Sequence, residues 1–564
     1  MGSRESMEYD ISLDYDACAT ERERGCVKSG SDTIEATHDH STAAAGGEAA
    51  LGDSGSDHEI ELKFVVPEGV LKGLSARLAA LEGAAKRGRA ARLVSVYFDT
   101  EDHALQAAGI SFRIRRRGRG RVQTIKKDAG GAGLYDRLEL ERPVRSEEPS
   151  LTNEESAAIA EMLGGPLYPD HTLAPIFVTT VKRTIFDVAR GEAEIEIALD
   201  EGIVEAAGRS ASFHELELEL KAGDAAALFA VAREAAGGTP FRLGVMTKSA
   251  RGYALLEGKE RSSYKEQDSP IVSGMDVEAA FRAVVSDCLA QYRLNEDLLL
   301  DKPGSKAIHR ARVGLRRLRS AFTLFKAVIS DQRSEAIAAE VKWLAGSLGD
   351  ARDLDVFRGR LPEGDEIGAE GLAARTEAHR QDAYREALGA IRSTRAPALL
   401  LDLVEWTTIG DWRSNPETAE ARAAPIERLA AEILDKRLKK LRKSGHGLSH
   451  LSPEERHKAR IAAKKLRYAC GFFGALYDER AAKRRDAFIE LMTDLQDELG
   501  ALNDIATARK LTTGLAREAG AERDGDAAFS AGLLAGKAEA GIDKLLRKAE
   551  KSLDRLCAAK PFWR

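Results

Sequence analysis

Charged and apolar residues alternate strictly over several short stretches between residues 58 and 260, and this alternation limits how the chain can fold. In Glu59-Ile-Glu-Leu-Lys-Phe64, the charged side chains share one side of an extended strand and the apolar side chains share the other. The same alternation recurs in at least five more stretches, at 113–117, 124–126, 137–141, 194–200 and 215–220. A period of two predicts β-strands with two chemically different faces.

The polar faces of these predicted strands consist almost wholly of Glu, Arg and Lys. A single strand of this kind is typical of a sheet with one face in water. Six of them together favour a closed barrel of about eight strands, which also removes exposed sheet edges. Inside such a barrel, carboxylates suit Mg²⁺ or Mn²⁺, and guanidinium and ammonium groups suit phosphate oxygens.

Charge is distributed unevenly along the 564 residues. Residues 1–57 hold 13 acids and 4 bases, a net charge of −9, so the remainder carries +3 of the overall −6. This segment lacks any helical or strand period and is predicted to be a disordered acidic tail. The sequence shows no apolar run of 18 residues, no secretory signal and five scattered cysteines without CxxC spacing. We therefore expect a cytoplasmic protein with free thiols and no membrane partner.

The periodicity divides the chain into a β-rich domain and an all-helical domain. Strand-like stretches fill residues 58–260, with helices expected near 68–82 and 223–236, and a period of 3.6 dominates from residue 272 to 564. The predicted fold class is α+β multidomain: a closed β barrel of about eight strands with flanking helices, then an all-α helical domain with repeats at about 272–400 and 420–564.

The β-rich domain resembles the CYTH domain, the family of triphosphate tunnel metalloenzymes. The resemblance rests on nine motifs in family order: Glu59-x-Glu61-x-Lys63, Tyr97-Phe-Asp99, Arg113-x-Arg115, Thr124-x-Lys126, Arg137-x-Glu139, Arg183, Glu196 with Asp200-Glu-Gly202, Glu215-x-Glu217-x-Glu219, and Lys248-Ser-Ala-Arg251. It implies an antiparallel eight-stranded tunnel that binds a triphosphate group and divalent cations.

The same resemblance implies roles for individual residues. The implied phosphate-binding residues are Lys63, Arg113, Arg115, Lys126, Arg183, Lys248 and Arg251. The implied metal ligands are Glu59, Glu61, Glu215, Glu217, Glu219 and Asp200. The implied catalytic set is Glu59, Glu61, Lys63, Arg137, Glu139, Arg183 and Glu196. The expected chemistry is attack of water on a terminal phosphoryl group with Mg²⁺ or Mn²⁺ as cofactor.

The helical domain contains an internal duplication. His309, Arg312, Arg316 and Arg319 match His457, Arg460, Lys464 and Arg467 at an offset of 148 residues. A second motif, LG-x-x-[RN]-D, follows in each half and includes Asp353 and Asp504. The spacing i, i+3, i+7, i+10 places each basic set on one stripe of a helix. Ser452-Pro-Glu-Glu455 predicts a capping box at the start of the second of these helices.

A stripe of four like charges needs an opposing partner, either acids in the fold or an external polyanion. A solvated basic face is the ordinary alternative for one copy. Nucleic acid is disfavoured because the stripes lack interleaved aromatic residues and the folded part carries only +3.

The two basic stripes with their LG motifs resemble the CHAD domain, over roughly residues 272–564. The resemblance implies two pseudo-symmetric helical bundles that bind inorganic polyphosphate, often at polyphosphate granules. The implied contacts are the eight residues of the two stripes, with Arg310, Arg317 and Lys465 secondary. Asp353 and Asp504 are expected either to orient these bases or to form simple salt bridges.

The sequence thus predicts a metal-dependent inorganic triphosphatase that splits tripolyphosphate into pyrophosphate and phosphate and carries a polyphosphate-binding domain. One alternative is a non-catalytic, granule-associated polyphosphate-binding protein. Another keeps catalysis but acts on thiamine triphosphate or a nucleoside triphosphate, including cyclase chemistry. The oligomeric state is left open.

Overall fold

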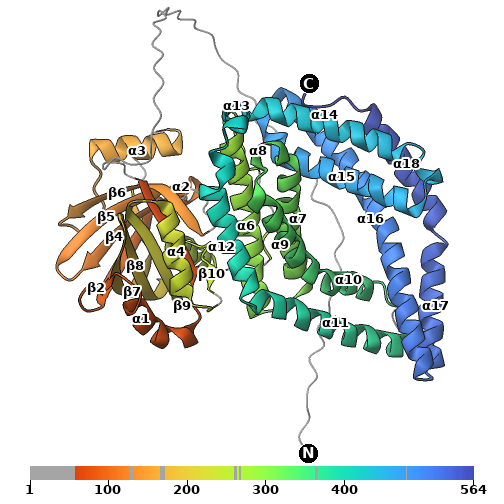
Figure 1. The fold of residues 1–564 in the computed structure, drawn as a ribbon, viewed down its shortest axis with the longest axis horizontal. Helices are drawn as coiled ribbons and strands as arrows, with labels where there is room; N and C mark the ends of the chain where they lie inside the picture. The colour runs from red at the N-terminus through yellow and green to blue at the C-terminus, as the bar shows by residue number, and fades with distance from the viewer. Residues whose placement is uncertain are drawn as a thin grey trace, which may run out of the picture. The chain divides into compact units, whose positions relative to one another are not determined.

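The computed structural model describes residues 58–127, 133–165, 172–239, 241–258, 263–265, 269–362, 366–477 and 479–564 (Figure 1). The predicted acidic tail, residues 1–57, lies outside the described residues. Within the described ranges, no helix is both long enough and apolar enough to cross a membrane.

Within the described part of the N-terminal half, ten strands form one antiparallel sheet. They are β1 (His58–Val65), β2 (Ala84–Lys86), β3 (Ala91–Asp99), β4 (Ile110–Arg117), β5 (Gly120–Lys127), β6 (Leu134–Val144), β7 (Ala174–Arg190), β8 (Ala193–Ala206), β9 (Arg209–Ala222) and β10 (Arg242–Leu243). The helices among them are α1 (Leu71–Ala79), α2 (Ala104–Ala107), α3 (Asn153–Leu163), α4 (Ala225–Ala236) and α5 (Lys248–Glu257).

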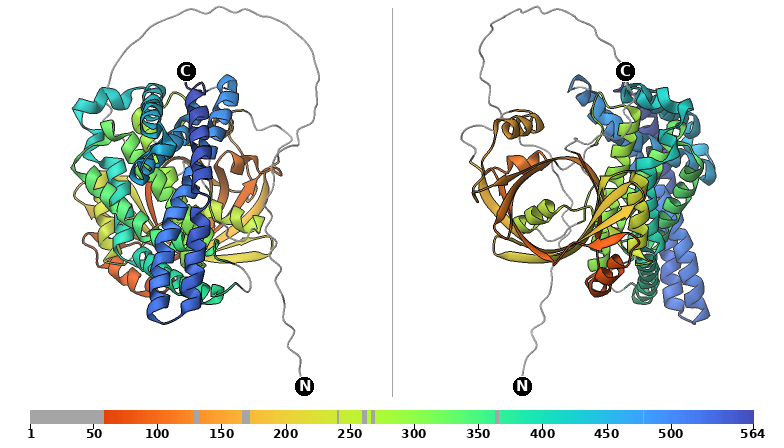
Figure 2. Two further views of the ribbon diagram at one scale, coloured as in Figure 1. Left: turned by 90° about the vertical axis from the view of Figure 1, so that its right-hand side faces the viewer. Right: turned by 60° about the vertical axis from the view of Figure 1, so that its left-hand side comes forward.

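The sheet closes on itself and forms a barrel. Its order runs β1-β6-β5-β4-β3-β7-β8-β9, and β9 pairs again with β1, where Lys63 lies opposite Glu217. The predicted tunnel of eight antiparallel strands is confirmed. Figure 2 (right) looks into this ring of strands and shows the short helix α5 inside it.

The barrel has its apolar face on the outside. Leu62, Leu216 and Leu218 are completely buried, and they belong to the same apolar cluster as Leu228 and Phe229 of the covering helix α4. A second cluster on β3, β4 and β5 packs beneath α2 and α3. Because strand side chains alternate, an apolar outer face requires the charged residues to point into the lumen.

The described residues of the C-terminal half form helices joined by loops. Its helices are α6 (Val277–Asp301), α7 (Ser305–Leu324), α8 (Lys326–Ile329), α9 (Gln332–Ser347), α10 (Gly349–Arg358), α11 (Ala369–Arg392), α12 (Arg395–Ile409), α13 (Ala419–Ala423), α14 (Ile426–Gly445), α15 (Pro453–Phe473), α16 (Glu479–Ala521), α17 (Gly525–Glu539) and α18 (Ile542–Ala558). Short 3₁₀ turns lie at η1 (Glu68–Val70), η2 (Asp411–Arg413), η3 (Pro416–Thr418), η4 (Leu448–His450) and η5 (Gly474–Leu476).

The two basic motifs form equivalent helices, α7 and α15. The predicted capping box at Ser452 is present, with Pro453 at the first helical position, whereas α7 begins after Gly304 without a side-chain cap. The second motif differs between the halves. In the first half Leu348 separates α9 from α10, but in the second half the corresponding residues run on within the single long helix α16.

Candidate active site and anion-binding pocket

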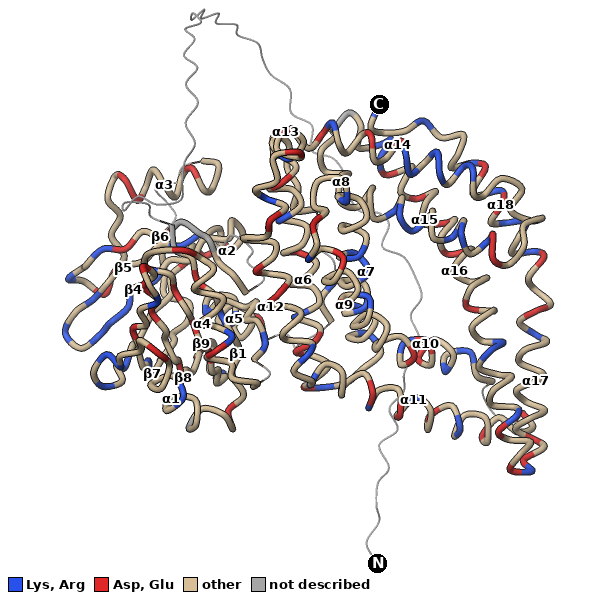
Figure 3. The backbone as a smooth tube through the Cα atoms, in the orientation of Figure 1, with Lys and Arg blue, Asp and Glu red and all other residues tan. Residues whose placement is uncertain are grey.

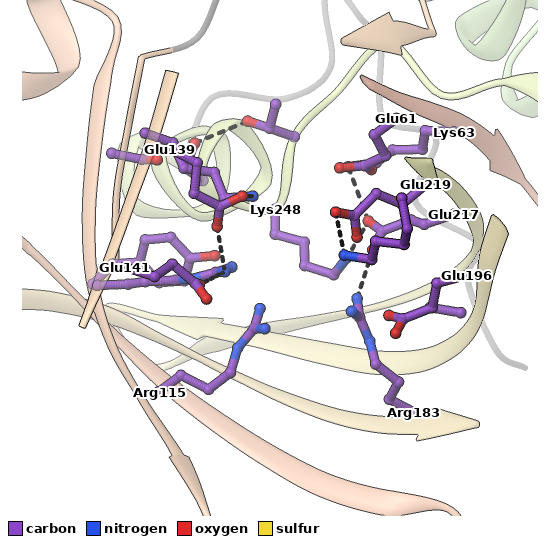
Figure 4. Close-up of a pocket in the computed structure, with 18 residues that line it drawn as sticks. Glu61, Lys63, Arg115, Glu139, Glu141, Arg183, Glu196, Glu217, Glu219 and Lys248 are labelled. Carbon is purple, nitrogen blue, oxygen red and sulfur yellow. Dashed lines mark hydrogen bonds and ion pairs between the residues drawn. The ribbon is translucent and has the colours of Figure 1, made fainter. Parts of the chain in front are cut away.

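The barrel lumen contains a cavity of about 220 Å³ with an almost entirely polar lining (Figure 4). The lining residues are Glu61, Lys63, Tyr97, Ser111, Arg113, Arg115, Lys126, Glu139, Glu141, Arg183, Glu196, Ala198, Glu217, Glu219, Lys221, Thr247, Lys248 and Ser249. Strand register brings opposite charges side by side, with Lys126 across from Glu139. Both signs of charge are thus distributed around one cavity in the barrel, as the alternation predicts.

Lys248 is the centre of an ion-pair network on one wall. From the start of α5, its Nζ lies 2.9 Å from Asp200, 3.1 Å from Glu215 and 2.5 Å from Glu217. Lys63 Nζ also reaches Glu217, at 3.0 Å. Burial opposes ionisation of Glu217, but Lys248 and Lys63 outweigh it and hold the pKa of this carboxyl well below its usual range. Glu217 is therefore an anion at neutral pH.

Arg115 differs from the other lumen cations. Its guanidinium points into the open centre of the cavity, whereas Arg183 reaches Glu217 at 2.5 Å (Figure 4). Within the described ranges of the chain, Arg115 has no carboxylate ion pair, and its Nε lies 3.3 Å from Ser95 Oγ. Burial, followed by repulsion from Arg113 and Arg183, lowers the pKa of Arg115 to about 10. An anion placed here would relieve that repulsion.

Tyr97 also lines the cavity, within the electrostatic influence of Arg113 and Arg115. Its ring stacks on Phe177 with centroids 4.5 Å apart, and its hydroxyl shares a hydrogen bond with Arg113. Burial alone would raise the pKa of Tyr97, but Arg113 and Arg115 outweigh it and lower that pKa. The region of the lumen around Arg113 and Arg115 therefore favours a negatively charged group.

The facing wall is held by a second set of ion pairs. Lys126 Nζ lies 2.7 Å from Glu139, and Arg113 lies 3.7 Å from Glu141. Thr124 donates a hydrogen bond of 2.7 Å to the same Glu141. These carboxylates keep the cations of β4 and β5 aimed across the lumen.

The structure brings most of the predicted tunnel residues to the cavity. Lys63, Arg113, Arg115, Lys126, Arg183, Lys248, Glu61, Glu139, Glu196, Glu217 and Glu219 all line it. Asp200, Glu215 and Arg251 lie behind this lining, where they form ion pairs with Lys248, Arg183 or one another. Glu59 and Arg137 belong to β1 and β6, but their side chains are not among those described.

Several lining residues were absent from the predicted set. Glu141 and Lys221 continue the alternation of predicted strands, so the pattern contained a signal for them. Thr247 and Ser249 come from the start of α5, which lies inside the ring, and strand alternation carries no signal for such residues.

The donor set fits a hard divalent cation. Glu61, Glu217 and Glu219 come from β1 and β9, where Glu61 lies directly opposite Glu219, and carboxylate oxygens are preferred ligands of Mg²⁺ and Mn²⁺. Within the described residues, however, no three His, Cys, Asp or Glu side chains are gathered closely enough to form a ready metal site. Two of these carboxylates are engaged by lysines: Lys63 pairs with Glu61 and Glu217, and Lys248 pairs with Glu217.

In the helical domain, α7 and α15 contribute to one pocket of about 750 Å³. Lys and Arg positions recur along both helices (Figure 3). From the predicted polyphosphate-binding set, the pocket includes Arg316, Arg319, His457, Arg460 and Lys464, together with Lys465 from the secondary set. The two basic stripes thus meet at one surface.

The cations of this pocket crowd one another. Burial, then repulsion from Arg460 and Arg316, lowers the pKa of Lys464 to about 7. Burial and the same kind of repulsion lower the pKa of His457. Burial is the larger cause of both shifts, and repulsion from the neighbouring cations adds to it.

Other members of the predicted set have different surroundings. His309, Arg312 and Arg467 do not line the pocket. Arg312 lies 3.5 Å from Asp353, which fits either of the two roles expected of that carboxylate, whereas Asp504 pairs with Arg360 at 3.1 Å. Arg467 donates a hydrogen bond to Gln496.

The secondary assignment of Arg317 to phosphate contact does not fit its position. Arg317 is buried, pairs with Asp287 at 2.7 Å and packs over Phe472. One residue along a helix turns the side chain by about 100°, so the neighbour of pocket-lining Arg316 faces the core.

The fold and the two sites define a charged β tunnel joined to a basic helical domain. Residues 57–253 match the model of the CYTH domain, and residues 283–513 match that of the CHAD domain. The chain therefore contains a CYTH domain followed by a CHAD domain, as the motifs predict.

Parts of the chain are also similar to individual known proteins. Over 216 residues the chain is 30% identical to an inorganic triphosphatase of Haemophilus influenzae, which covers 36% of this chain and 59% of that protein. The CHAD domain from the plant Ricinus communis is 27% identical, with a TM-score of 0.46, and the match covers 52% of this chain and 97% of that one. HpAC1 from Hippeastrum, described as having a dominant triphosphatase activity, is 19% identical, with a TM-score of 0.26, over 36% of this chain and 97% of that one.

Proposed function

We propose that the CYTH domain hydrolyses inorganic tripolyphosphate to pyrophosphate and phosphate, and that the CHAD domain binds inorganic polyphosphate. The observation that carries the first part is Arg115, a cation that points into the lumen cavity and has no carboxylate partner in the described ranges. The inorganic triphosphatase of Haemophilus influenzae, 30% identical over 216 residues, supports the same reaction.

The size and lining of the cavity favour an inorganic substrate. A space of about 220 Å³ lined by charged groups suits a short phosphate chain, and Ala198 and Tyr97 are the least polar residues of its lining. A nucleoside or thiamine moiety is normally held by apolar and aromatic surfaces. The cavity therefore favours tripolyphosphate over thiamine triphosphate and nucleoside triphosphates.

The lumen residues divide the work of the reaction. Arg113, Arg115 and Lys126 bind phosphate oxygens and hold the chain in line for attack, while Arg183 and Lys248 stabilise charge that develops on it. Glu61, Glu217 and Glu219 would hold Mg²⁺ or Mn²⁺, which neutralises the phosphates and lowers the pKa of bound water. A lumen carboxylate accepts the proton of the attacking water. Glu217, with its strongly lowered pKa, is a better ligand than base.

The helical pocket supports the second part of the proposal. A polyphosphate chain carries charge at every unit and needs no base-stacking surface, which matches a pocket built from Arg, Lys and His. Binding of the polymer here holds the enzyme among phosphate chains and raises their local concentration at the tunnel. The same binding would place the protein at polyphosphate granules.

The test is a substrate panel on the full chain. Phosphate release is measured from tripolyphosphate, thiamine triphosphate, ATP and long-chain polyphosphate, each with Mg²⁺, with Mn²⁺ and with a chelator. We expect metal-dependent release from tripolyphosphate above all others, and loss of release in Glu61→Ala and Glu217→Ala variants that remain folded. Binding of tripolyphosphate without turnover would instead indicate a non-catalytic polyphosphate-binding protein.

A further inference from the structure

Arg293 of α6 connects the helical domain to a strand of the barrel. Its Nε donates a hydrogen bond of 2.9 Å to the carbonyl oxygen of Leu243 in β10. The Arg293 side chain is 0% exposed, so this contact is made in complete isolation from water. A buried guanidinium is costly unless its donors are satisfied, which fixes its geometry.

Acidic residues of the same helix hold Arg293 in place. Glu296, also fully buried, forms a close ion pair with it, and Asp297 lies 3.0 Å away. Asp297 reaches Arg242 of β10 at 2.7 Å, and Tyr292 donates a 3.0 Å hydrogen bond to Glu296. The cluster therefore binds both residues of β10: Leu243 through its backbone carbonyl and Arg242 through its side chain.

The residue after β10 is in direct contact with a lumen lysine. Gly244 donates its N-H to the carbonyl oxygen of Lys63 at 2.8 Å, and its own carbonyl oxygen accepts a 2.9 Å hydrogen bond from Tyr135. A Cβ at position 244 would lie 2.6 Å from Lys63 Cγ. The Lys63 stem thus packs directly against this backbone, with no room for a side chain between them.

These contacts form a continuous path from the helical domain into the cavity. Arg293 holds Leu243, Leu243 pairs with Phe64 across the β1–β10 ladder, and Gly244 confines Lys63. Lys63 then presents its Nζ to Glu217 at 3.0 Å within the lumen.

We infer that Arg293 is a positioning residue for hydrolysis in the tunnel: it fixes β10 and thereby the Lys63 ammonium. This inference rests on the proposed triphosphatase activity. The helical domain then has a second role besides polymer binding, because it completes the support of the active site. A displacement of about 1 Å at a reacting group reduces a rate by up to about 100-fold.

The test compares Arg293→Met with Arg413→Met in the full chain. Arg413 is a matched control because it pairs with Glu278 near the start of the same helix, at 2.7 Å. We expect kcat/KM for tripolyphosphate to fall at least about tenfold in Arg293→Met, chiefly through kcat, and to stay within about twofold of wild type in Arg413→Met. Circular dichroism and long-chain polyphosphate binding establish that each variant is folded.

A double-mutant cycle shows whether the effect passes through Lys63. In a Lys63→Arg background, Arg293→Met should cost far less than in the wild type. Gly244→Ala, which leaves the Arg293 cluster intact, should reproduce the loss, and it replaces Arg293→Met in the cycle if that variant does not fold. Additive effects, or full activity in Arg293→Met and Gly244→Ala, would overturn the inference while leaving triphosphatase activity in the wild type. No phosphate release by the wild type would overturn the proposed function and this inference with it.

Discussion

Arg115 and Arg116 are neighbours on β4, yet only Arg115 lines the cavity, and Arg116 is exposed. This opposition follows from the alternation of a strand, and it supplies a matched pair of variants. Arg115→Ala removes a donor from the phosphate chain and should lower kcat/KM for tripolyphosphate about 100-fold. Arg116→Ala removes the same charge outside the lumen and should change kcat/KM less than about twofold. Steady-state phosphate release measures both, and equal effects would argue against direct phosphate contact by Arg115.

Loss of Glu217 should destabilise the barrel. Glu217→Gln leaves Lys248, Lys63 and Arg183 with one carboxylate fewer among them, and removal of one partner from a buried ion network costs about 3–5 kcal/mol. Tripolyphosphate should restore part of this stability by supplying negative charge. Thermal unfolding with and without the ligand measures the effect. The control is Glu147→Gln, since Glu147 is 67% exposed in its pair with Arg121 and its loss should leave the unfolding temperature nearly unchanged.

Polyphosphate binding should weaken as the pH rises through neutrality. The pKa of Lys464 is lowered to about 7 in the free protein, and a bound polyanion raises it because it favours the ammonium form. The contribution of Lys464 to affinity is therefore complete below pH 7 and is lost as the pH rises above 7, through its pKa in the complex.

Isothermal titration at a series of pH values measures this dependence. Lys464→Arg should flatten it, because arginine stays charged over the range. Lys458→Arg, at an exposed position of the same helix, should leave it unchanged. A profile that stays the same in Lys464→Arg would assign the dependence to another group.

Two arginines of the basic stripes should differ in their effect on the polymer. Arg316 lines the shared pocket, whereas Arg467 lies outside its lining and bonds to Gln496. Arg316→Ala should weaken long-chain polyphosphate binding and reduce its salt dependence, and Arg467→Ala should do so much less. Gel shifts across a salt series, with DNA of equal charge as competitor, measure both. Equal retention of DNA and polyphosphate would show that the pocket does not select for the polymer.

Much of the barrel was predictable because the alternation within each strand's own sequence shows which of its faces is charged and which is apolar. The alternation in Glu59–Phe64 and 215–220 places the charged side chains on one face of each strand. The pairing of β1 with β9 closes the sheet and turns that face toward the lumen. Which charges touch the open space depends on long-range packing. Asp200 and Glu215 have the right side chains, but Arg183 and Lys248 hold them behind the wall.

Helical contributions were harder to predict. Thr247 and Ser249 line the cavity because α5 lies inside the ring, and no local period indicates that position. Arg316 and Arg317 are adjacent in a basic run, and only the tertiary fold decides that one lines the pocket while the other pairs with Asp287. The role inferred for Arg293 likewise depends on a contact 50 residues away in sequence, with Leu243.

Three lumen cations, Lys63, Lys248 and Arg183, are each already paired with a carboxylate of the protein. An incoming anion must exchange places with these carboxylates. A molecule with a single phosphate offers too few oxygens to replace several partners at once, whereas a chain of three can do so together. The displaced carboxylates then become available to cations that arrive with the chain, so entry of substrate and of metal should be cooperative.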